Sequence, residues 1–107
     1  MSRKQKLYVE ILWRALPYIR GMSQAGLWRR IRDRSAYEEA EFIHNLPVSI
    51  LEPEFTEHDI WFLNHQARFY VTQSGSPHVA THLPYIAELF RLVPDEVRPK
   101  LEWPGPE

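Results

Sequence analysis

Residues 56–73 form the stretch that most constrains what this chain can fold into. Stepped at the helical angle of about 100° per residue, five apolar side chains fall into one stripe: Ile60, Leu63, Ala67, Tyr70 and Val71. Phe62 and Phe69 fall on nearly the opposite side, and Trp61 stands between the two faces. A surface helix needs only one apolar face. The pattern therefore predicts either the central helix of the domain or a helix whose second face is kept for a partner chain.

The ends of this helix are marked in the sequence. Thr56 is a good N-cap, whose hydroxyl can accept from the backbone N–H of Asp59, and Pro53 discourages an earlier start. Residues 74–77, Ser-Gly-Ser-Pro, are typical of a stop followed by a turn. We expect the helix to run from about 57 to 73.

Further helices are expected on both sides of this one. Residues 4–20 carry an apolar arc wider than half the circumference, and Pro17 predicts a kink or an early end there. A short helix is expected over residues 27–34. Ser35 and Glu38 match a capping box that opens a helix to about residue 45, with its glutamates mostly outward.

The second half of the chain adds one more helix and two irregular segments. Thr81 is expected to cap a helix that tolerates Pro84 in its first turn. Prolines bracket residues 46–55, which we expect to lie against the core as an extended or single-turn segment. Residues 98–107 form a proline-rich tail, in which Trp103 either folds back on the domain or is offered to a partner.

These elements predict an all-α fold, a compact bundle of four to five helices. The 107 residues suit a single helical domain over 1–97, followed by the tail over 98–107. The chain has no cysteine, which fits a reducing compartment, and no run of 18 apolar residues. We therefore expect a cytoplasmic protein without a membrane partner.

The net charge of −1 hides a strong asymmetry along the chain. Residues 1–34 hold nine Lys/Arg and two acids (+7), whereas residues 35–107 hold four Lys/Arg and twelve acids (−8). This division favours mutual attraction, within the fold or across a dimer, over a polyanion-binding end. The alternative function is nucleic-acid binding through one basic cluster: Trp28, Arg29, Arg30, Arg32 and Arg34.

No pattern in the sequence indicates catalysis. His58 and His65 lie on one side of the central helix, but the third ligand of a zinc site is not convincing, so neither metal nor cofactor is expected. The serines lack a nucleophile-elbow context, and the clustered glutamates sit in polar sequence. We do not expect an enzyme.

The two-faced helix and the divided charge together favour action through protein–protein contact. The protein is expected to form a homodimer, or to be an accessory or inhibitor-type subunit of another protein. The predicted contact combines the aromatic residues of the central helix with the basic cluster: Trp61, Phe62, Phe69, Trp28, Arg29, Arg30, Arg32 and Arg34.

Overall fold

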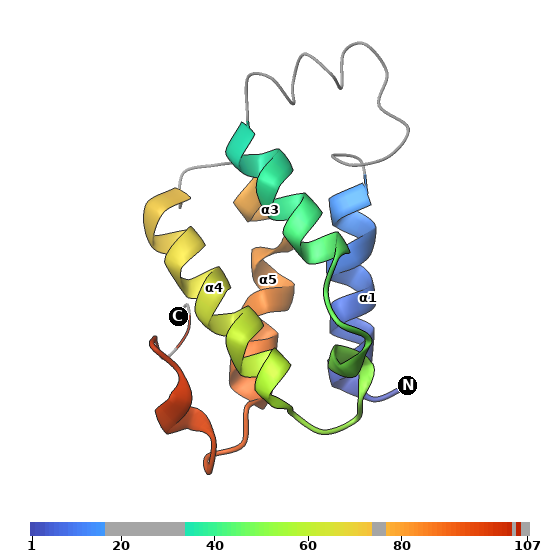
Figure 1. The fold of residues 1–107 in the computed structure, drawn as a ribbon, viewed down its shortest axis with the longest axis vertical. Coiled ribbons are helices and arrows are strands. Elements are labelled where there is room, and N and C mark those ends of the chain that lie inside the picture. Colours follow the sequence, from blue (N-terminus) through green and yellow to red (C-terminus); the bar gives the residue numbers. More distant parts are fainter. Residues whose placement is uncertain (17–33, 74–76, 104, 106–107) are drawn as a thin grey trace.

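The computed structural model describes residues 1–16, 34–73, 77–103 and 105. These ranges hold the helices α1 (Arg3–Ala15), α3 (Arg34–His44), α4 (Glu57–Gln73) and α5 (Pro77–Leu92), with short 3-10 helices η2 (Val48–Leu51) and η3 (Arg98–Lys100). The described residues contain no strand, so the predicted all-α class is confirmed. In the view of Figure 1, α3 lies between α4 and α1, and the described C-terminal segment runs beside α4.

The first helix ends early, as its proline predicts. Ser2 and Gln5 form a capping box: the Gln5 N–H donates to the Ser2 hydroxyl at 3.3 Å, and the Ser2 N–H donates to the Gln5 amide oxygen at 2.6 Å. α1 stops at Ala15, two residues before Pro17. Residues 17–20 of the expected first helix lie outside the described residues, as do residues 27–33 of the helix expected over 27–34.

Two helix starts differ from the sequence-based expectation. α3 begins at Arg34, so Ser35 lies inside the helix and is not its N-cap. α5 begins at Pro77 and not after Thr81, which places Pro84 in the helix interior. Proline suits the first position of a helix because it has no N–H to leave unpaired. Because α5 already starts at Pro77, Pro84 lies within the helix, which continues past it to Leu92.

The proline-bracketed segment packs against the core as expected. Its residues Val48–Leu51 form a single 3-10 turn, in which Ile50 is buried and Val48 points to solvent. α4 follows with the predicted bounds, Glu57–Gln73.

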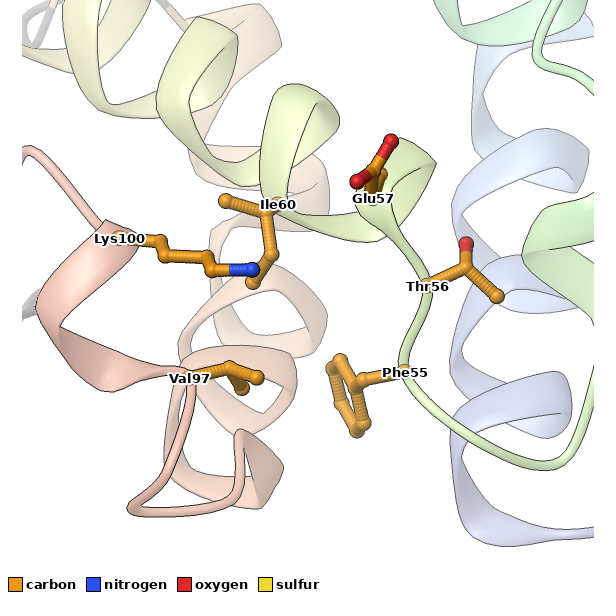
Figure 2. Close-up of a pocket in the computed structure, with 6 residues that line it drawn as sticks. All are labelled: Phe55, Thr56, Glu57, Ile60, Val97 and Lys100. Atoms are coloured by element: carbon orange, nitrogen blue, oxygen red, sulfur yellow. The ribbon is translucent and has the colours of Figure 1, made fainter.

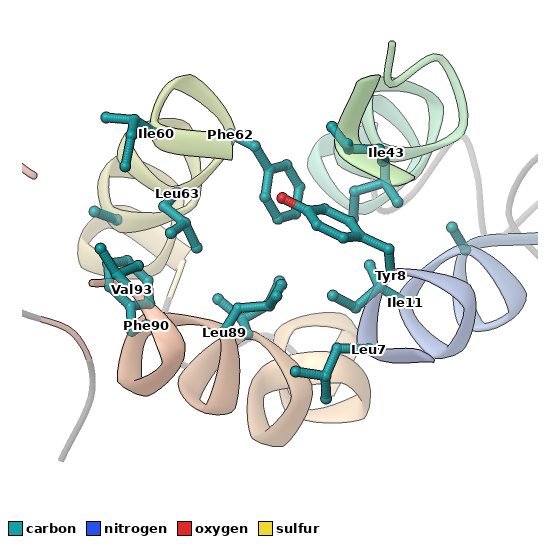
Figure 3. Close-up of a cluster of buried hydrophobic side chains, with 14 of the residues drawn as sticks. Leu7, Tyr8, Ile11, Ile43, Ile60, Phe62, Leu63, Leu89, Phe90 and Val93 are labelled. Carbon is teal, nitrogen blue, oxygen red and sulfur yellow. The ribbon is translucent and has the colours of Figure 1, made fainter. Parts of the chain in front are cut away.

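Both apolar faces of α4 are buried within this one chain, as far as the structure describes their side chains. Ile60 and Leu63 lie towards α5, where Figure 3 places them beside Phe90 and Val93. Phe62 points the other way and meets Tyr8 of α1, with their ring centroids 5.3 Å apart. Phe62 is 0% exposed, so the prediction that it contacts a partner is wrong. A bundle of four helices leaves room in its middle for this second apolar face.

The described part of the C-terminal tail folds back on the domain. Trp103 packs edge-on against Phe90 of α5, with ring centroids 5.5 Å apart. The Asn64 side chain accepts from the Glu102 N–H at 2.8 Å and donates to the Lys100 carbonyl at 3.2 Å. Gly105 has a φ of 114° and lies so close to Phe90 that a Cβ would stand 2.9 Å from its Cβ, which only glycine can accept. The fold-back interpretation of Trp103 is confirmed.

A buried ion pair joins the start of α1 to the start of α4. The Lys4 ammonium lies 2.7 Å from the Asp59 carboxylate, and the two side chains are only 2% and 0% exposed. Lys4 also donates to the carbonyls of Glu52 and Glu54 at 2.9 and 2.6 Å, so all three of its N–H donors have acceptors. Its charge is thereby satisfied without water.

Asp59 is held by further donors on both of its oxygens. Tyr8 donates its hydroxyl to Asp59 at 2.7 Å, and the Thr56 N–H donates to the other oxygen at 2.6 Å. The Thr56 hydroxyl donates to that same oxygen at 3.1 Å, where the sequence predicts that it accepts from the Asp59 N–H. The reversal follows from burial, because a buried carboxylate needs every donor within reach.

Two other basic residues of the N-terminal helix also have partners in the fold. Arg3 forms an ion pair with Glu88 of α5, whereas Arg14 pairs with Glu10 on its own helix and donates to the hydroxyl of Tyr85 at 2.6 Å. Arg3 and Lys4 both belong to the positively charged third of the chain, and both of their partners belong to the negative remainder. At Arg3 and Lys4, the divided charge thus serves attraction within the fold.

Replacing Asp59 by alanine is expected to lower the free energy of unfolding by about 3–5 kcal/mol, because the buried Lys4 ammonium loses its counter-ion. Glu57→Ala is the matched control: it removes an exposed acid from the same first turn and should cost less than about 1 kcal/mol. Chemical denaturation of both variants measures the difference. Equal losses of unfolding free energy in the two variants contradict a structural role for the buried ion pair.

Tyr8 makes stability depend on alkaline pH. Burial, then the charge of Asp59 and the hydrogen bond to it, raise the pKa of Tyr8 well above its usual value. The folded state therefore keeps a proton that the unfolded chain loses above about pH 10. The contribution of Tyr8 to the free energy of unfolding is complete below pH 10 and declines as the pH rises further.

In Tyr8→Phe this proton linkage is absent. Denaturation at pH values from about 8 to 11 should show a shallower alkaline loss of stability for the variant than for the original chain. If the free energy of unfolding falls equally with pH in the variant and in the original chain, a raised pKa for Tyr8 is contradicted.

Candidate interaction surface

Trp61 is a large apolar side chain that the fold leaves half exposed. It lies on the outward flank of α4 and is 49% exposed. Its ring packs at a tilt of 53° against Phe42 of α3, with ring centroids 4.8 Å apart. The contact fixes the orientation of the indole while leaving its other side to solvent.

Phe42 connects this surface to the core. Its ring is nearly parallel to that of the buried Phe62, at a centroid distance of 6.3 Å and an angle of 3°. His65 of α4 stacks on Phe42 at 3.8 Å. Phe42 of α3 thus lies beside three rings of α4, those of Trp61, Phe62 and His65.

A buried glutamate holds His65 in place. Glu39 accepts a hydrogen bond from the amide of Gln66, and its other oxygen lies 2.9 Å from His65 Nε2. The Glu39 side chain is almost fully buried, so the expectation that the α3 glutamates point outward is wrong for this residue. Because Glu39 lies four residues before Ile43, it belongs to the buried stripe of α3. Its negative charge is matched by these two donors on α4.

The 3-10 turn η2 extends the surface beyond the two helices. Ser49 forms a hydrogen bond with His58 in the first turn of α4, one turn before Trp61. Its neighbour Val48 is 82% exposed. We call the surface formed by five side chains of α3, η2 and α4 the Trp61 face: Phe42, Val48, His58, Trp61 and His65.

The two histidines that the sequence places on one side of α4, His58 and His65, have separate partners. His58 binds Ser49, whereas His65 binds Glu39 and stacks on Phe42. Across the described ranges, no group of three metal-ligating side chains comes together.

A pocket of about 400 Å³ lies at the start of α4, beside the segment that follows α5. Figure 2 shows Phe55 and Val97 on its walls and the Lys100 side chain extending towards Ile60. The Thr56 hydroxyl at its rim already donates to Asp59. The ionisable side chains in its lining, Glu57 and Lys100, are both exposed.

A second, apolar pocket of about 270 Å³ lies between α1 and the end of α3. Its lining consists of five residues: Val9, Leu12, Trp13, Leu16 and His44. Trp13 is highly exposed there.

Most of the other predicted contact residues lie where the structure does not describe them. Trp28, Arg29, Arg30 and Arg32 fall in residues 17–33, so nucleic-acid binding by this cluster stays a prediction. Arg34 begins α3 and Phe69 lies in α4, but their side chains are not described.

Of the two predicted contact residues whose side chains the structure describes, Trp61 lies on the surface and Phe62 in the core. Sequence analysis missed its neighbour Phe42 and the exposure of Val48 on η2. Phe42 lies four residues after Glu38 and so shares the outward, acidic side of α3. An aromatic residue on that side is the signal that could have identified Phe42 as part of the surface.

Comparison with family models, curated proteins and solved structures found no match. None of the described helices is long and apolar enough to cross a membrane.

Adjacent residues of α4 test the division between core and surface. Phe62→Ala should lower the free energy of unfolding by about 3–5 kcal/mol, since it empties the space between Tyr8 and Phe42. Trp61→Ala should cost about 1 kcal/mol, because the ring has only one side packed. Thermal or chemical denaturation compares the two, and a larger loss for Trp61 contradicts the assignment.

Proposed function

We propose that this protein acts by binding another protein, either a different chain or a second copy of itself, through the Trp61 face. It acts as an accessory, inhibitor-type or dimerising subunit without catalytic activity of its own. The absence of cysteine supports a place in the cytoplasm. The observation that carries the proposal is the half-exposed Trp61 ring, fixed in position by Phe42.

A fixed aromatic ring makes a good anchor because little conformational entropy is lost when a partner covers it. Trp61 packs on Phe42, Phe42 stacks with His65, and His65 is held by the buried Glu39. The side chains behind the indole are therefore ordered before any partner arrives. Tryptophan is also among the residues most enriched in interface hot spots.

The exposed area is large enough to matter for affinity. About half of the Trp61 side chain, on the order of 100 Å², is available, and burying it contributes about 2–3 kcal/mol. Val48 offers a second apolar contact beyond the first turn of α4. The α3 acids and the two α4 histidines surround this apolar centre with polar groups, the arrangement typical of interfaces.

The proposal is tested by placing the photo-crosslinking residue p-benzoylphenylalanine at position 61 in the native cell. A crosslinked partner is expected from position 61, but not from position 92, where the exposed Leu92 of α5 provides the control. Trp61→Ala should weaken the captured complex by about 2 kcal/mol, roughly thirtyfold.

Sedimentation of the purified protein over a concentration series shows whether the partner is a second copy. A partner captured equally from positions 61 and 92, or a complex unaffected by Trp61→Ala, contradicts the proposal.

A further inference from the structure

We infer that the pocket at the start of α4 binds a free amino acid with an apolar side chain. Its volume of about 400 Å³ is typical of a site for a small molecule. None of the five residues of the Trp61 face lines this pocket, so the site is additional to the proposed function and needs no partner protein.

Three segments that are distant in the sequence meet at the pocket. Its walls come from the residues before α4, from the first turn of α4 and from the segment that follows α5: Phe55, Thr56, Glu57, Ile60, Val97 and Lys100. A ligand that fills the pocket therefore contacts all three segments.

The apolar walls are held in place by contacts inside the protein. The Lys4 ammonium of the buried ion pair lies 5.3 Å from the centre of the Phe55 ring. On the opposite wall, the Lys100 N–H donates to the Val97 carbonyl at 3.0 Å, and Asn64 of α4 donates to the Lys100 carbonyl at 3.2 Å. Little conformational entropy is lost when a ligand fills a pocket whose walls are already fixed.

The polar groups at the rim are divided into a donor on one side and acceptors on the other. Figure 2 shows Lys100 on one side of the pocket, with Thr56 and Glu57 on the other. The Lys100 ammonium can only donate, and the Glu57 carboxylate can only accept. The Thr56 hydroxyl is also left to accept, because it donates its one proton to Asp59. A ligand that suits this rim has one acceptor group and one donor group.

The two opposite charges at the rim have no partner within the described part of the chain. The Lys100 ammonium and the Glu57 carboxylate form no ion pair with each other, and no other side chain there engages either group. An exposed charge contributes little to binding by itself. These two charges flank a single apolar pocket, however, so a ligand that enters the pocket meets both of them.

This combination decides between classes of small molecule. A carboxylate without an ammonium pairs with Lys100 but brings negative charge beside Glu57, and an amine without a carboxylate has the opposite fault. An uncharged apolar molecule leaves both charges unmatched. A free amino acid carries both groups on one carbon, and its side chain extends from that carbon into the apolar walls. Its carboxylate accepts from Lys100, and its ammonium donates to Glu57 and Thr56.

Two amino acids and three analogues test the class of ligand. The amino acids are L-phenylalanine and L-leucine. Of the analogues, 3-phenylpropanoate lacks the ammonium, phenethylamine lacks the carboxylate and glycine lacks the apolar side chain. NMR titration of the full chain should show saturable shifts of the Phe55, Ile60 and Val97 amide signals with an apolar amino acid. Each analogue should bind about tenfold more weakly or worse, since it loses a charge-assisted hydrogen bond or the apolar contact.

Two outcomes of this titration overturn the inference. One is the absence of shifts at these signals with either amino acid. The other is binding of 3-phenylpropanoate or phenethylamine as tight as that of L-phenylalanine, which shows that the pocket takes a simple carboxylate or amine.

Two variants assign each charge of the ligand to its residue. In Lys100→Met the carboxylate has no cation to meet, so L-phenylalanine should lose most of its advantage over phenethylamine. In Glu57→Gln the ammonium has no anion to meet, so L-phenylalanine should lose most of its advantage over 3-phenylpropanoate. Each comparison isolates one contact, because the analogue already lacks the group that the variant deprives of its partner.

Matched controls remove the same charges elsewhere on the surface. Lys6→Met and Glu41→Gln change exposed residues of α1 and α3 and should leave every affinity unchanged. Circular dichroism verifies that all four variants fold. If the controls weaken L-phenylalanine as much as the pocket variants, or if Lys100→Met leaves its binding intact, the inference is overturned.

Discussion

The buried contact between Lys4 and Asp59 is the constraint on which the arrangement of this bundle depends. It joins the first turn of α1 to the first turn of α4, residues 55 apart in sequence, and draws in the backbone of the segment between η2 and α4. Two charges leave water here only because each has several partners, among them Tyr8 and Thr56. Once they are in place, the register between α1 and α4 is fixed.

This register sets the position of Phe62. From α4 it fills the space beside Tyr8 and stacks with Phe42, and Phe42 in turn supports Trp61 on the outside. The surface proposed for partner binding is therefore built on the core through a series of touching rings. Glu39 strengthens the connection by holding His65 against Phe42. A substitution of Phe62 in the core should change the position of the Trp61 ring, although Phe62 is buried and Trp61 faces solvent.

Much of this fold could be predicted from local pattern, and the failures have physical causes. The bounds of α4, the packed segment before it and the early end of α1 follow from prolines, a cap and helical periodicity. Phe62 was misassigned because periodicity shows that a helix has two apolar faces but not which element covers the second. Glu39 was expected to point outward because sequence alone does not show a distant partner. The same limit hid Phe42 and Val48, whose exposure depends on how α3 and η2 meet α4.

The sequence by itself determined the helical class, the main helix over residues 57–73 and the division of charge along the chain, since these depend on neighbours within a few turns or on simple counting. Only the tertiary structure decided which charges are buried and which aromatic rings reach the surface. Lys4 meets Asp59, and Phe42 meets Trp61, across separations that no local pattern records. Contacts of that kind arise from the joint packing of α1, α3 and α4.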